Sequence, residues 1–453
     1  MRTPVGRLGL WAMMPIPLRL VMGLIVLVVL GSAALLLPFA AVRPLSLEEA
    51  LFTAVSALTV TGLSILAPGR DLTVLGQIVL AVLIQIGGVG FMVIAVIILR
   101  LVGRQIMLDD RLALRDSLGL LSAAEIVQLV RRALIAIAIM EGSGALALWL
   151  HWRNTLPLSE ERVLLYAFFH AISAFCNAGF DLFTGLPEFP EGVPNDGITL
   201  FILAALIVLG GLGIPVIGDL LTWRWTHKLS LHTRVTLLLS AALTFGGGGL
   251  IFLAETLSRG AISEAPWSAR LGLSIFQAIS ARTAGYSGFP NFDHISAGAQ
   301  LTLVSLMFIG AAPASMGGGI TTGTFAVIAL AAWGYLRRLP ETQVAQRTIS
   351  HDTLRRAVAV LVVSLMLLTA ASYLLVITHP MLRVDQAVFE VVSAFATCGL
   401  SLGATNALTS FGHAVLMVVM FWGRLGPLTV VAALATPRRQ RHLAFPEGHI
   451  LIG

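Results

Sequence analysis

The stretch Val392–Leu400, VSAFATCGL, ends a short apolar segment with a glycine that follows small and hydroxyl residues. A closely similar stretch, SAFCNAGF at 173–180, stands more than two hundred residues earlier. Two further copies, SALTVTGLS and SARTAGYSG, bring the pattern to four, and its glycines are 117, 106 and 114 residues apart. The sequence therefore predicts four nearly equal internal repeats. Their glycines are Gly62, Gly179, Gly285 and Gly399.

The composition is that of a polytopic membrane protein. Of the 453 residues, 57% are hydrophobic and 11% are charged, whereas a soluble domain has roughly 25% charged residues. A charge-free run of about 20 residues can cross the ~30 Å hydrocarbon core as a helix. Five such runs are predicted spans: 20–42, 72–99, 197–218, 235–254 and 357–378.

The distribution of charge predicts the topology. The net charge is +6, and most basic residues cluster at the N-terminus, at 100–132, 224–234 and 337–356, and in the C-terminal tail. Acidic residues favour the alternate loops, such as 160–196. By the positive-inside rule, both termini and three loops are cytoplasmic. The excess charge thus indicates topology and gives no reason to expect a nucleic-acid partner.

Each repeat also contains a segment that is too short to cross a membrane. These segments lie at 46–59, 162–176, 268–281 and 385–397. About 14 residues make a helix of ~21 Å, shorter than the hydrocarbon core. The predicted unit is a span, a re-entrant half helix, a loop at the glycine and a second span. We predict an all-α polytopic membrane protein with four tandem membrane-helix/pore-helix/membrane-helix pseudo-repeats around a central ion pore. The predicted divisions are 1–103, 104–222, 223–338, which holds a broken helix, 339–436, and a cytoplasmic tail at 437–453.

The four glycine loops are the candidate ion site. Non-helical backbone at membrane depth is tolerated only inside protein or along a water-filled pathway, and a ring of carbonyls can replace the hydration shell of a cation. The alternative is that the glycines only allow close helix packing, as we expect for the clusters at 86–90, 209–213 and 246–249. Four copies in equivalent places favour the pore. The predicted filter residues, with K⁺ on their backbone carbonyls, are Val60, Thr61, Gly62, Asn177, Ala178, Gly179, Thr283, Ala284, Gly285, Thr397, Cys398 and Gly399.

Over nearly its whole length the chain resembles the Trk/Ktr/HKT superfamily of potassium transporters, and within it the KtrB-like membrane subunits. The resemblance is carried by four signatures in order, VTGL, NAGF, TAGY and TCGL, and by a single span before the first. It implies potassium uptake in the bacterial plasma membrane, a homodimer, and a cytoplasmic ring of KtrA-like RCK-domain subunits that bind ATP or ADP. This chain itself is expected to bind no cofactor.

The four signatures are not identical. Val60 stands where the second repeat has Asn177 and the others have threonine, and the third repeat is one residue shorter between its serine and its glycine. The ring is therefore not expected to be fourfold symmetric. Members of the family with serine at the first filter glycine tend to favour sodium, whereas Gly62 indicates potassium.

The third repeat has a second predicted feature, a helix broken within the membrane. Residues 295–336 are 42 positions without a charge, and GAAPASMGGGITTGT at 310–324 interrupts them. Glycine and proline cost ~1 and ~3 kcal/mol relative to alanine inside a helix. The alternative is a passive kink, but the resemblance implies an intramembrane gate beneath the filter, whose hydroxyls can satisfy its own backbone. The predicted gate residues are Gly310, Pro313, Ser315, Gly317, Gly318, Gly319, Thr321, Thr322, Gly323 and Arg424.

Three ionisable residues lie inside apolar segments, where such groups are costly. Arg424 is 25 residues beyond Gly399 and is expected below the filter, where its charge would hinder a cation; the alternative role is to pair with a loop carbonyl or a carboxylate. Arg282 is expected to brace loop carbonyls from behind, and Glu141 to bond a neighbouring helix.

Other classes of function are less consistent with the sequence. No GxGxxG, P-loop or HExxH motif is present, and the histidines lack metal-ligand spacing, so we expect no enzyme. The alternative that stays open is a proton- or sodium-coupled secondary transporter of another cation or solute. Channel-like flux, coupled flux and activation by sodium all fit this sequence.

Overall fold

A computed structural model describes residues 16–90, 126–339, 343–344 and 347–426. The end of the 72–99 run, most of the basic cluster at 100–132 and the tail at 437–453 lie outside the described residues. The described part is helical apart from an antiparallel hairpin of two-residue strands, β1 (Gln343–Val344) and β2 (Arg347–Thr348), and a single bridge between Ala41 and Leu72. The predicted all-α class is confirmed.

The helices recur in the same order along the chain. A first helix in each repeat is α2 (Ile16–Leu35), α8 (Ile126–Thr155), α12 (Leu231–Leu257) and α16 (His351–Thr378). The short helices that follow are α3 (Leu47–Leu58), α9 (Glu160–Phe175), α13 (Trp267–Ser280) and α17 (Val384–Phe395). The next are α5 (Val74–Val89), α10 (Gly197–Gly211), α14 (Ala297–Ile309) and α18 (Ser410–Leu425). The remaining helices are α4 (Pro68–Asp71), α11 (Ile214–Thr226), α15 (Thr322–Leu336), η1 (Phe292–His294) and η2 (Thr405–Ala407).

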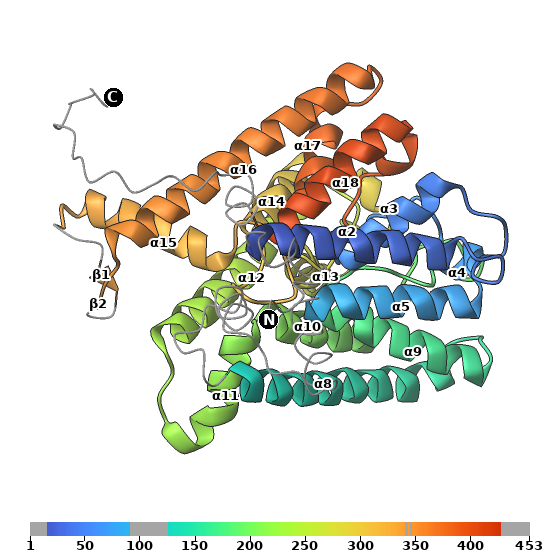
Figure 1. Ribbon diagram of the computed structural model, residues 1–453, viewed down its shortest axis with the longest axis horizontal. Coiled ribbons are helices and arrows are strands. Elements are labelled where there is room, and N and C mark those ends of the chain that lie inside the picture. The colour runs from blue at the N-terminus through green and yellow to red at the C-terminus, as the bar shows by residue number, and fades with distance from the viewer. Residues whose placement is uncertain (1–15, 91–125, 340–342, 345–346, 427–453) are drawn as a thin grey trace, which may run out of the picture.

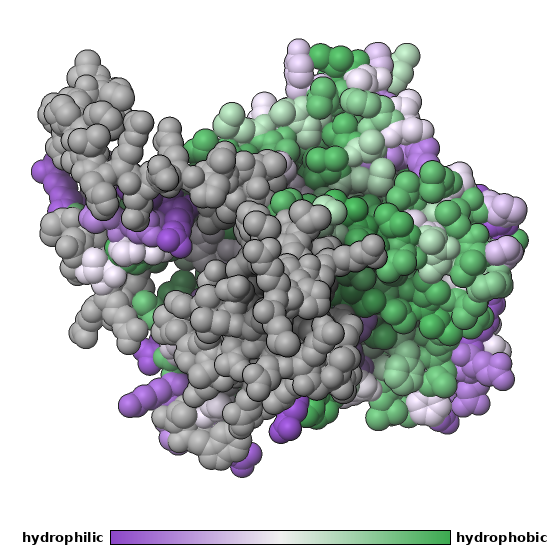
Figure 2. Space-filling view, in the orientation of Figure 1, coloured by the Kyte–Doolittle hydropathy of each residue, from purple (hydrophilic) through white to green (hydrophobic). Residues whose placement is uncertain are grey.

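Within the described ranges, three helices are long and apolar enough to cross a membrane alone: 134–155 within α8, α12 and α16. The bent pair of α10 and α11 makes a fourth candidate among the described residues, and the other apolar helices are shorter. Figure 2 shows hydrophobic side chains over much of the coloured face, with hydrophilic residues along its right edge. The chain is a multi-pass membrane protein.

The short helices end in a shared hydrogen-bond pattern. In three repeats the amide of the residue before the glycine donates to the carbonyl of the serine five residues earlier, at 2.8 Å in each. Those amides belong to Thr61, Ala178 and Cys398. In the third repeat Ala284 donates to Ser280, only four residues earlier, also at 2.8 Å. This tighter turn accounts for the third repeat being one residue shorter between its serine and its glycine.

In each repeat the helix α5, α10, α14 or α18 is followed, within two residues of its end, by a glycine with positive φ. The sequence predicted such an interruption only in the third repeat and an unbroken span at 197–218, and the second prediction is wrong. Gly213, with φ of 85°, ends the helical path after α10, and α11 leaves at 100°. Glycine adopts this conformation without steric cost, and Pro215 in the first turn of α11 has no N–H to continue the helix. The other three are Gly90 at 84°, Gly310 at 72° and Gly426 at 81°.

A second glycine, three residues earlier, lets these helices touch the ends of the short helices. A Cβ on Gly87, Gly210 or Gly423 would overlap the carbonyl oxygen of Leu58, Phe175 or Phe395 respectively. The third repeat has Met307 at this place. The clusters at 86–90 and 209–213 thus make the expected close contacts and also end their helices. In the cluster at 246–249, Gly247 and Gly248 are packed while the outer two glycines face open space.

Figure 1 shows how these elements are arranged. α2, α5, α9 and α8 follow one another across the lower right of the view, and neighbours in this series are in contact. α11, α15 and the hairpin extend on the left, whereas α4 lies on the right. The predicted boundary between the second and third repeats, after residue 222, falls within α11.

Candidate functional site

The four glycine loops contact one another in a closed cycle. At each glycine an added Cβ would overlap the carbonyl oxygen that precedes the glycine of another loop. Backbone therefore meets backbone at all four contacts, and only glycine fits them. The pairs are Gly62 with Ala178, Gly179 with Ala284, Gly285 with Cys398, and Gly399 with Thr61.

We call the twelve residues 60–62, 177–179, 283–285 and 397–399 the ring. Its backbone is unusual in the same way in each loop. The four glycines have positive φ, between 65° and 94°. The residue two places before each glycine also has positive φ, between 50° and 79°. Those residues are Val60, Asn177, Thr283 and Thr397. Three of them are β-branched, for which positive φ is a genuine outlier. Such strain persists only where the surroundings hold it and is concentrated at functional sites. All the non-glycine ring residues are fully buried.

Side chains also join the second and third loops. The Thr283 hydroxyl donates to the amide oxygen of Asn177 at 3.1 Å, in the orientation that lets the amide nitrogen donate to Ala174 and Ile207. The Tyr286 hydroxyl donates to the carbonyl of Phe180 at 3.1 Å. No equivalent pair of side chains joins the other loops in the described residues, so the ring departs from fourfold symmetry as the sequence predicted.

A cavity of about 520 Å³ opens at the ring and is lined by its four glycines. Asp181, Glu191 and Arg70 also line it, together with several backbone and hydroxyl groups. This cavity lies on the side of α4 and the loops that follow the ring glycines, and its acidic side chains suit a cation.

The segment between α14 and α15 lies against the ring. A Cβ on Gly317 would overlap the Thr283 hydroxyl, and one on Gly318 would be 2.7 Å from the Thr397 hydroxyl. The segment covers 310–321, because Thr322 and Gly323 are already in the first turn of α15. We call 310–321 the gate loop. Its Ala312 and Met316 amides donate to the carbonyls of Gly211 and Gly210, where α10 ends.

The other predicted gate residues have distinct places. Gly310, Gly319 and Thr321 have positive φ, and Pro313 packs against Gly323, where an added Cβ would be 2.7 Å from the proline ring. Ser315 accepts a bond from the Gly317 amide at 3.3 Å. The expectation that the hydroxyls of Ser315, Thr321, Thr322 and Thr324 satisfy the backbone of the loop when it shifts stays a prediction. In the structure the Thr321 and Thr324 hydroxyls bond each other at 3.4 Å.

Arg424 links three parts of the chain. Its guanidinium donates to the carbonyls of Met316 in the gate loop, Gly87 and Gly88, the last at 3.0 Å. It takes part in none of the ion pairs among the described residues. The pairing with a loop carbonyl that was considered for it is present, at Met316. Because its partners are neutral, its positive charge is not cancelled.

The other two membrane ionisable groups bond as follows. Arg282 donates to Ser240, at 3.1 Å to the hydroxyl, and to the Gly310 carbonyl at 3.3 Å. It therefore braces the start of the gate loop, and no bond from it to a ring carbonyl is present. Glu141 accepts from Gln85 at 3.2 Å and contacts the Cys176 thiol at 3.8 Å, so its expected bond to a neighbouring helix is present.

Among the described residues, Glu255 and Glu390 are fully buried carboxylates that sequence reasoning missed, and Glu390 lies in α17, which ends at the ring. The oxygens of Glu390 accept from Ser401 at 2.5 Å, from Thr405 at 2.6 Å and from the Leu402 amide at 3.1 Å. The available signal was its place three residues before the serine of the fourth repeat, which is occupied by His170 in the second repeat.

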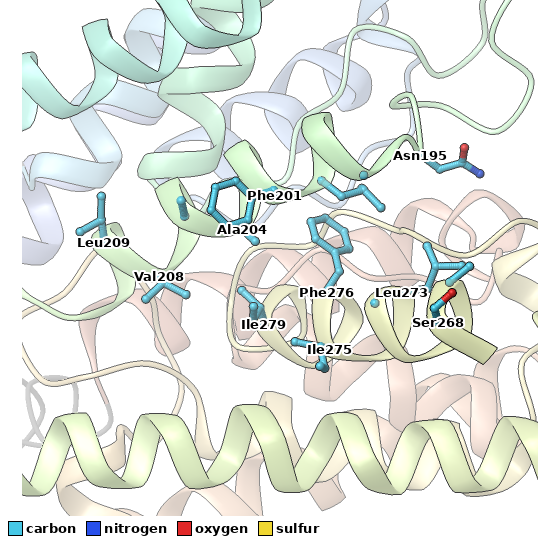
Figure 3. Close-up of a pocket in the computed structure, with 15 residues that line it drawn as sticks. Asn195, Phe201, Ala204, Val208, Leu209, Ser268, Leu273, Ile275, Phe276 and Ile279 are labelled. Atoms are coloured by element: carbon cyan, nitrogen blue, oxygen red, sulfur yellow. The ribbon is translucent and has the colours of Figure 1, made fainter. Parts of the chain in front are cut away.

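A second cavity lies away from the ring. It has a volume of about 970 Å³ and lies between α10 and α13. Figure 3 shows Phe201, Ala204 and Val208 of α10 facing the same space as Phe276 and Ile279 of α13. Because its lining is almost entirely apolar, this cavity offers no ligands for an ion.

The family model TrkH, described as a cation transport protein, matches residues 19–441. The chain belongs to this family. Its relatives include the Ktr system potassium uptake protein B of Vibrio alginolyticus, 36% identical over 94% of this chain and 92% of that protein, and that of Bacillus subtilis, 35% identical over 98% of each. The predicted resemblance to KtrB-like members of the Trk/Ktr superfamily is confirmed, and because members of this TrkH family are named as transporters, so is the prediction that the chain is not an enzyme.

One further relative and one solved structure are similar to this chain. The potassium/sodium uptake protein NtpJ of Enterococcus hirae is 32% identical over 95% of this chain and 96% of that protein. The crystal structure of the potassium transporter TrkH from Vibrio parahaemolyticus has a TM-score of 0.72 at 19% identity, covering 93% of this chain and 84% of that one. At that identity the likeness shows a shared fold.

Proposed function

We propose that the chain carries potassium into the cell and that the ring of four loops is its selectivity filter. The observation that carries the proposal is the closed cycle of glycine contacts, which brings four strained loops together at one place. The printed names of the relatives, potassium uptake proteins, supply the ion.

The physical basis is a ring that needs no carboxylate. The twelve ring residues are neutral, and backbone carbonyls can take the place of the hydration shell of K⁺. α3, α9, α13 and α17 end immediately before the ring, so the negative ends of their dipoles favour a cation there. The K⁺ ions would bind at the carbonyls of these loops.

The gate loop is the proposed barrier on the other side of the ring. It lies against Thr283 and Thr397, and the Arg424 guanidinium, bound to the Met316 carbonyl, adds a positive charge to the path. A cation must displace this loop to pass. Opening therefore requires that the bonds between the gate loop, α10 and Arg424 change.

Control of this gate is assigned to a cytoplasmic partner. The relatives are named as proteins of a Ktr system, and family resemblance supplies the expected partner, a KtrA-like RCK-domain ring that binds ATP or ADP, together with a homodimer of this chain. α15 leads from the gate loop to the exposed Arg337 and Arg338. These arginines, and Arg224 and Lys228 around the end of α11, favour a cytoplasmic location for this side and for both termini.

Growth of a bacterial strain that lacks its own potassium uptake systems tests the proposal. Expression of this chain with its cytosolic subunit should restore growth at low potassium, and rubidium uptake should rise in parallel. Restored uptake of sodium alone, or of neither ion, would contradict it.

A second candidate function is sodium-coupled potassium uptake, which the name of the Enterococcus hirae relative favours. In that case external sodium should accelerate rubidium uptake and enter with it. Acceleration without sodium entry would instead indicate activation by sodium.

Arg424→Ala should increase rubidium flux several-fold. The change removes a fixed charge and three hydrogen bonds that hold the gate loop and α5; bonds from charged groups contribute about 1.5–3 kcal/mol each. Initial rubidium uptake into proteoliposomes is the measurement, and Arg424→Lys, which keeps the charge, should stay closer to the parent protein. A folded Arg424→Ala variant with unchanged or slower flux would show that Arg424 is no barrier.

A further inference from the structure

Each short helix carries a polar residue three places before its repeat serine. These residues are Thr53, His170, Gln277 and Glu390. All four are fully buried, and each is preceded directly in its helix by a phenylalanine, so that they stand next to apolar residues. Because buried polar groups are retained where they make hydrogen bonds, their partners indicate what this position does.

In three of the four repeats the partner is the loop just beyond the ring glycine. His170 Nε2 lies 3.0 Å from the carboxylate of Asp181, two residues after Gly179. Gln277 accepts from the amide of Gly288, three residues after Gly285, at 3.0 Å. Glu390 accepts from Ser401 and Leu402, two and three residues after Gly399.

The first repeat differs. The hydroxyls of Thr53 and Ser56 have no hydrogen-bond partner among the described residues. Its outer loop is held by other means, including the Asp71 carboxylate, which accepts from the Ala67 amide at 2.9 Å. Burial opposes the ionisation of Asp71, but bonds from Arg70 and Ala67 outweigh it, and the pKa of the carboxyl lies below its ordinary value.

Glu390 makes the most extensive set of these bonds. Besides Ser401 and Leu402 it accepts from the Thr405 hydroxyl, so one carboxylate holds the loop from 401 to 405. It takes part in none of the ion pairs of the described residues. A buried carboxylate without a cationic partner is costly unless its hydrogen bonds are complete. Its three donors therefore have to stay in place.

This loop is continuous with the ring. Gly399 meets the Thr61 carbonyl and closes the cycle of four loops, and its amide donates to the Ser393 hydroxyl at 3.1 Å. Ser393 and Glu390 are three residues apart and so lie on the same side of α17. The helix thus holds the loop at two points, one at the glycine and one just beyond it.

We propose that Glu390 is a positioning residue for the fourth ring loop and thereby a determinant of ion selectivity. Its carboxylate fixes 401–405, and this sets where Gly399 stands against the first loop. The effect on selectivity rests on the proposed function of the ring as a potassium filter. The tether itself does not depend on that function and can be measured separately.

The experiment uses Glu390→Gln and the double variant Ser401→Ala/Thr405→Val. The first keeps the shape of the side chain and removes its charge. The second removes two donors and leaves α17 intact. Asp385→Asn is the matched control, because it makes the same charge change on the same helix at an exposed residue paired with Arg383 at 2.7 Å.

Two measurements are made on each purified full-length variant. Hydrogen exchange of the peptide containing 400–406 reports the tether, and we expect about tenfold faster exchange at Leu402 in both test variants, since bonds to charged groups are the stronger ones. The rubidium-to-sodium uptake ratio in proteoliposomes reports selectivity, and it should fall severalfold in both test variants and not in Asp385→Asn.

The two readouts separate the possible failures. Unchanged exchange in folded variants would overturn the tether. Faster exchange with an unchanged ion ratio would overturn the role in selectivity. A lower ratio in Glu390→Gln alone would also overturn positioning and indicate a direct effect of charge. A parent protein that does not prefer rubidium would contradict the proposed filter, while the exchange data would still decide the tether.

Discussion

Gly62→Ser is expected to remove most of the discrimination between rubidium and sodium. Gly62 has φ of 86°, and the Ala178 carbonyl oxygen lies where a Cβ on this residue would be. A side chain here must displace that carbonyl, in addition to a strain of roughly 1–3 kcal/mol for a residue held at such φ. A distortion that costs K⁺ about 1.4 kcal/mol lowers the ratio about tenfold. The uptake ratio of the two ions in proteoliposomes measures it.

Gly90→Ser is the matched control for this variant. Gly90 has nearly the same φ, 84°, but no atom of the described residues lies within 4 Å of an added Cβ. Its strain is similar and its overlap is absent, so its ion ratio should stay near that of the parent protein. If folded Gly62→Ser keeps the parent ratio, the ring of glycines is not the filter.

Removing residues 315–318 from the gate loop is expected to raise basal rubidium flux at least about tenfold. These residues supply the Met316 carbonyl that Arg424 binds and the two glycines that lie against Thr283 and Thr397. A factor of ten corresponds to a loss of about 1.4 kcal/mol from the barrier. The flux should also become insensitive to the RCK-domain subunit and to ATP or ADP. Uptake is measured with and without these additions.

Thr302→Val is the control for general disturbance of α14. Thr302 is half-buried, and its hydroxyl donates to the Gly298 carbonyl within the same helix, at 2.8 Å. This variant should keep both the low basal flux and its response. A shortened loop whose flux still responds to nucleotide would return the glycines of 310–323 to a passive kink.

The short helices and the ring were predictable because they repeat. The predicted segments at 46–59, 162–176, 268–281 and 385–397 each contain a helix whose ends lie within two residues of the predicted ones. A single SAFxxxG is ambiguous between packing and a loop. Four copies at similar spacing favour the loop, because packing alone does not require equal intervals.

The ends of α5, α10 and α18 were not predicted, for a physical reason. Glycine after an apolar run can serve either close helix contacts or left-handed turns. Here Gly87 and Gly210 make close contacts, and Gly90 and Gly213 adopt positive φ three residues later. The break at 310 was visible only because Pro313 and several further glycines follow it.

The bonds of Arg424 and Glu390 depend on contacts far apart in the chain. Arg424 binds Gly87, more than three hundred residues away. Because its partners are neutral carbonyls, no acidic residue in the sequence indicates where the arginine binds. Glu390 has apolar residues on both sides in the sequence, Phe389 and Val391, and they give no indication of its partners. Its role becomes clear only when the four repeats are compared at their serines and the positions of the loops beyond the glycines are known.

The most direct test of the potassium pathway is ion flux through the purified protein. Proteoliposomes with this chain and its cytosolic subunit are loaded with potassium, and uptake of rubidium and of sodium is compared with and without a protonophore. We predict rubidium uptake that exceeds sodium uptake at least about tenfold and that collapses towards the sodium value in Gly62→Ser. Rubidium uptake that disappears only when the protonophore is added would indicate coupling to protons, whereas equal uptake of the two ions would contradict a potassium filter formed by these four loops.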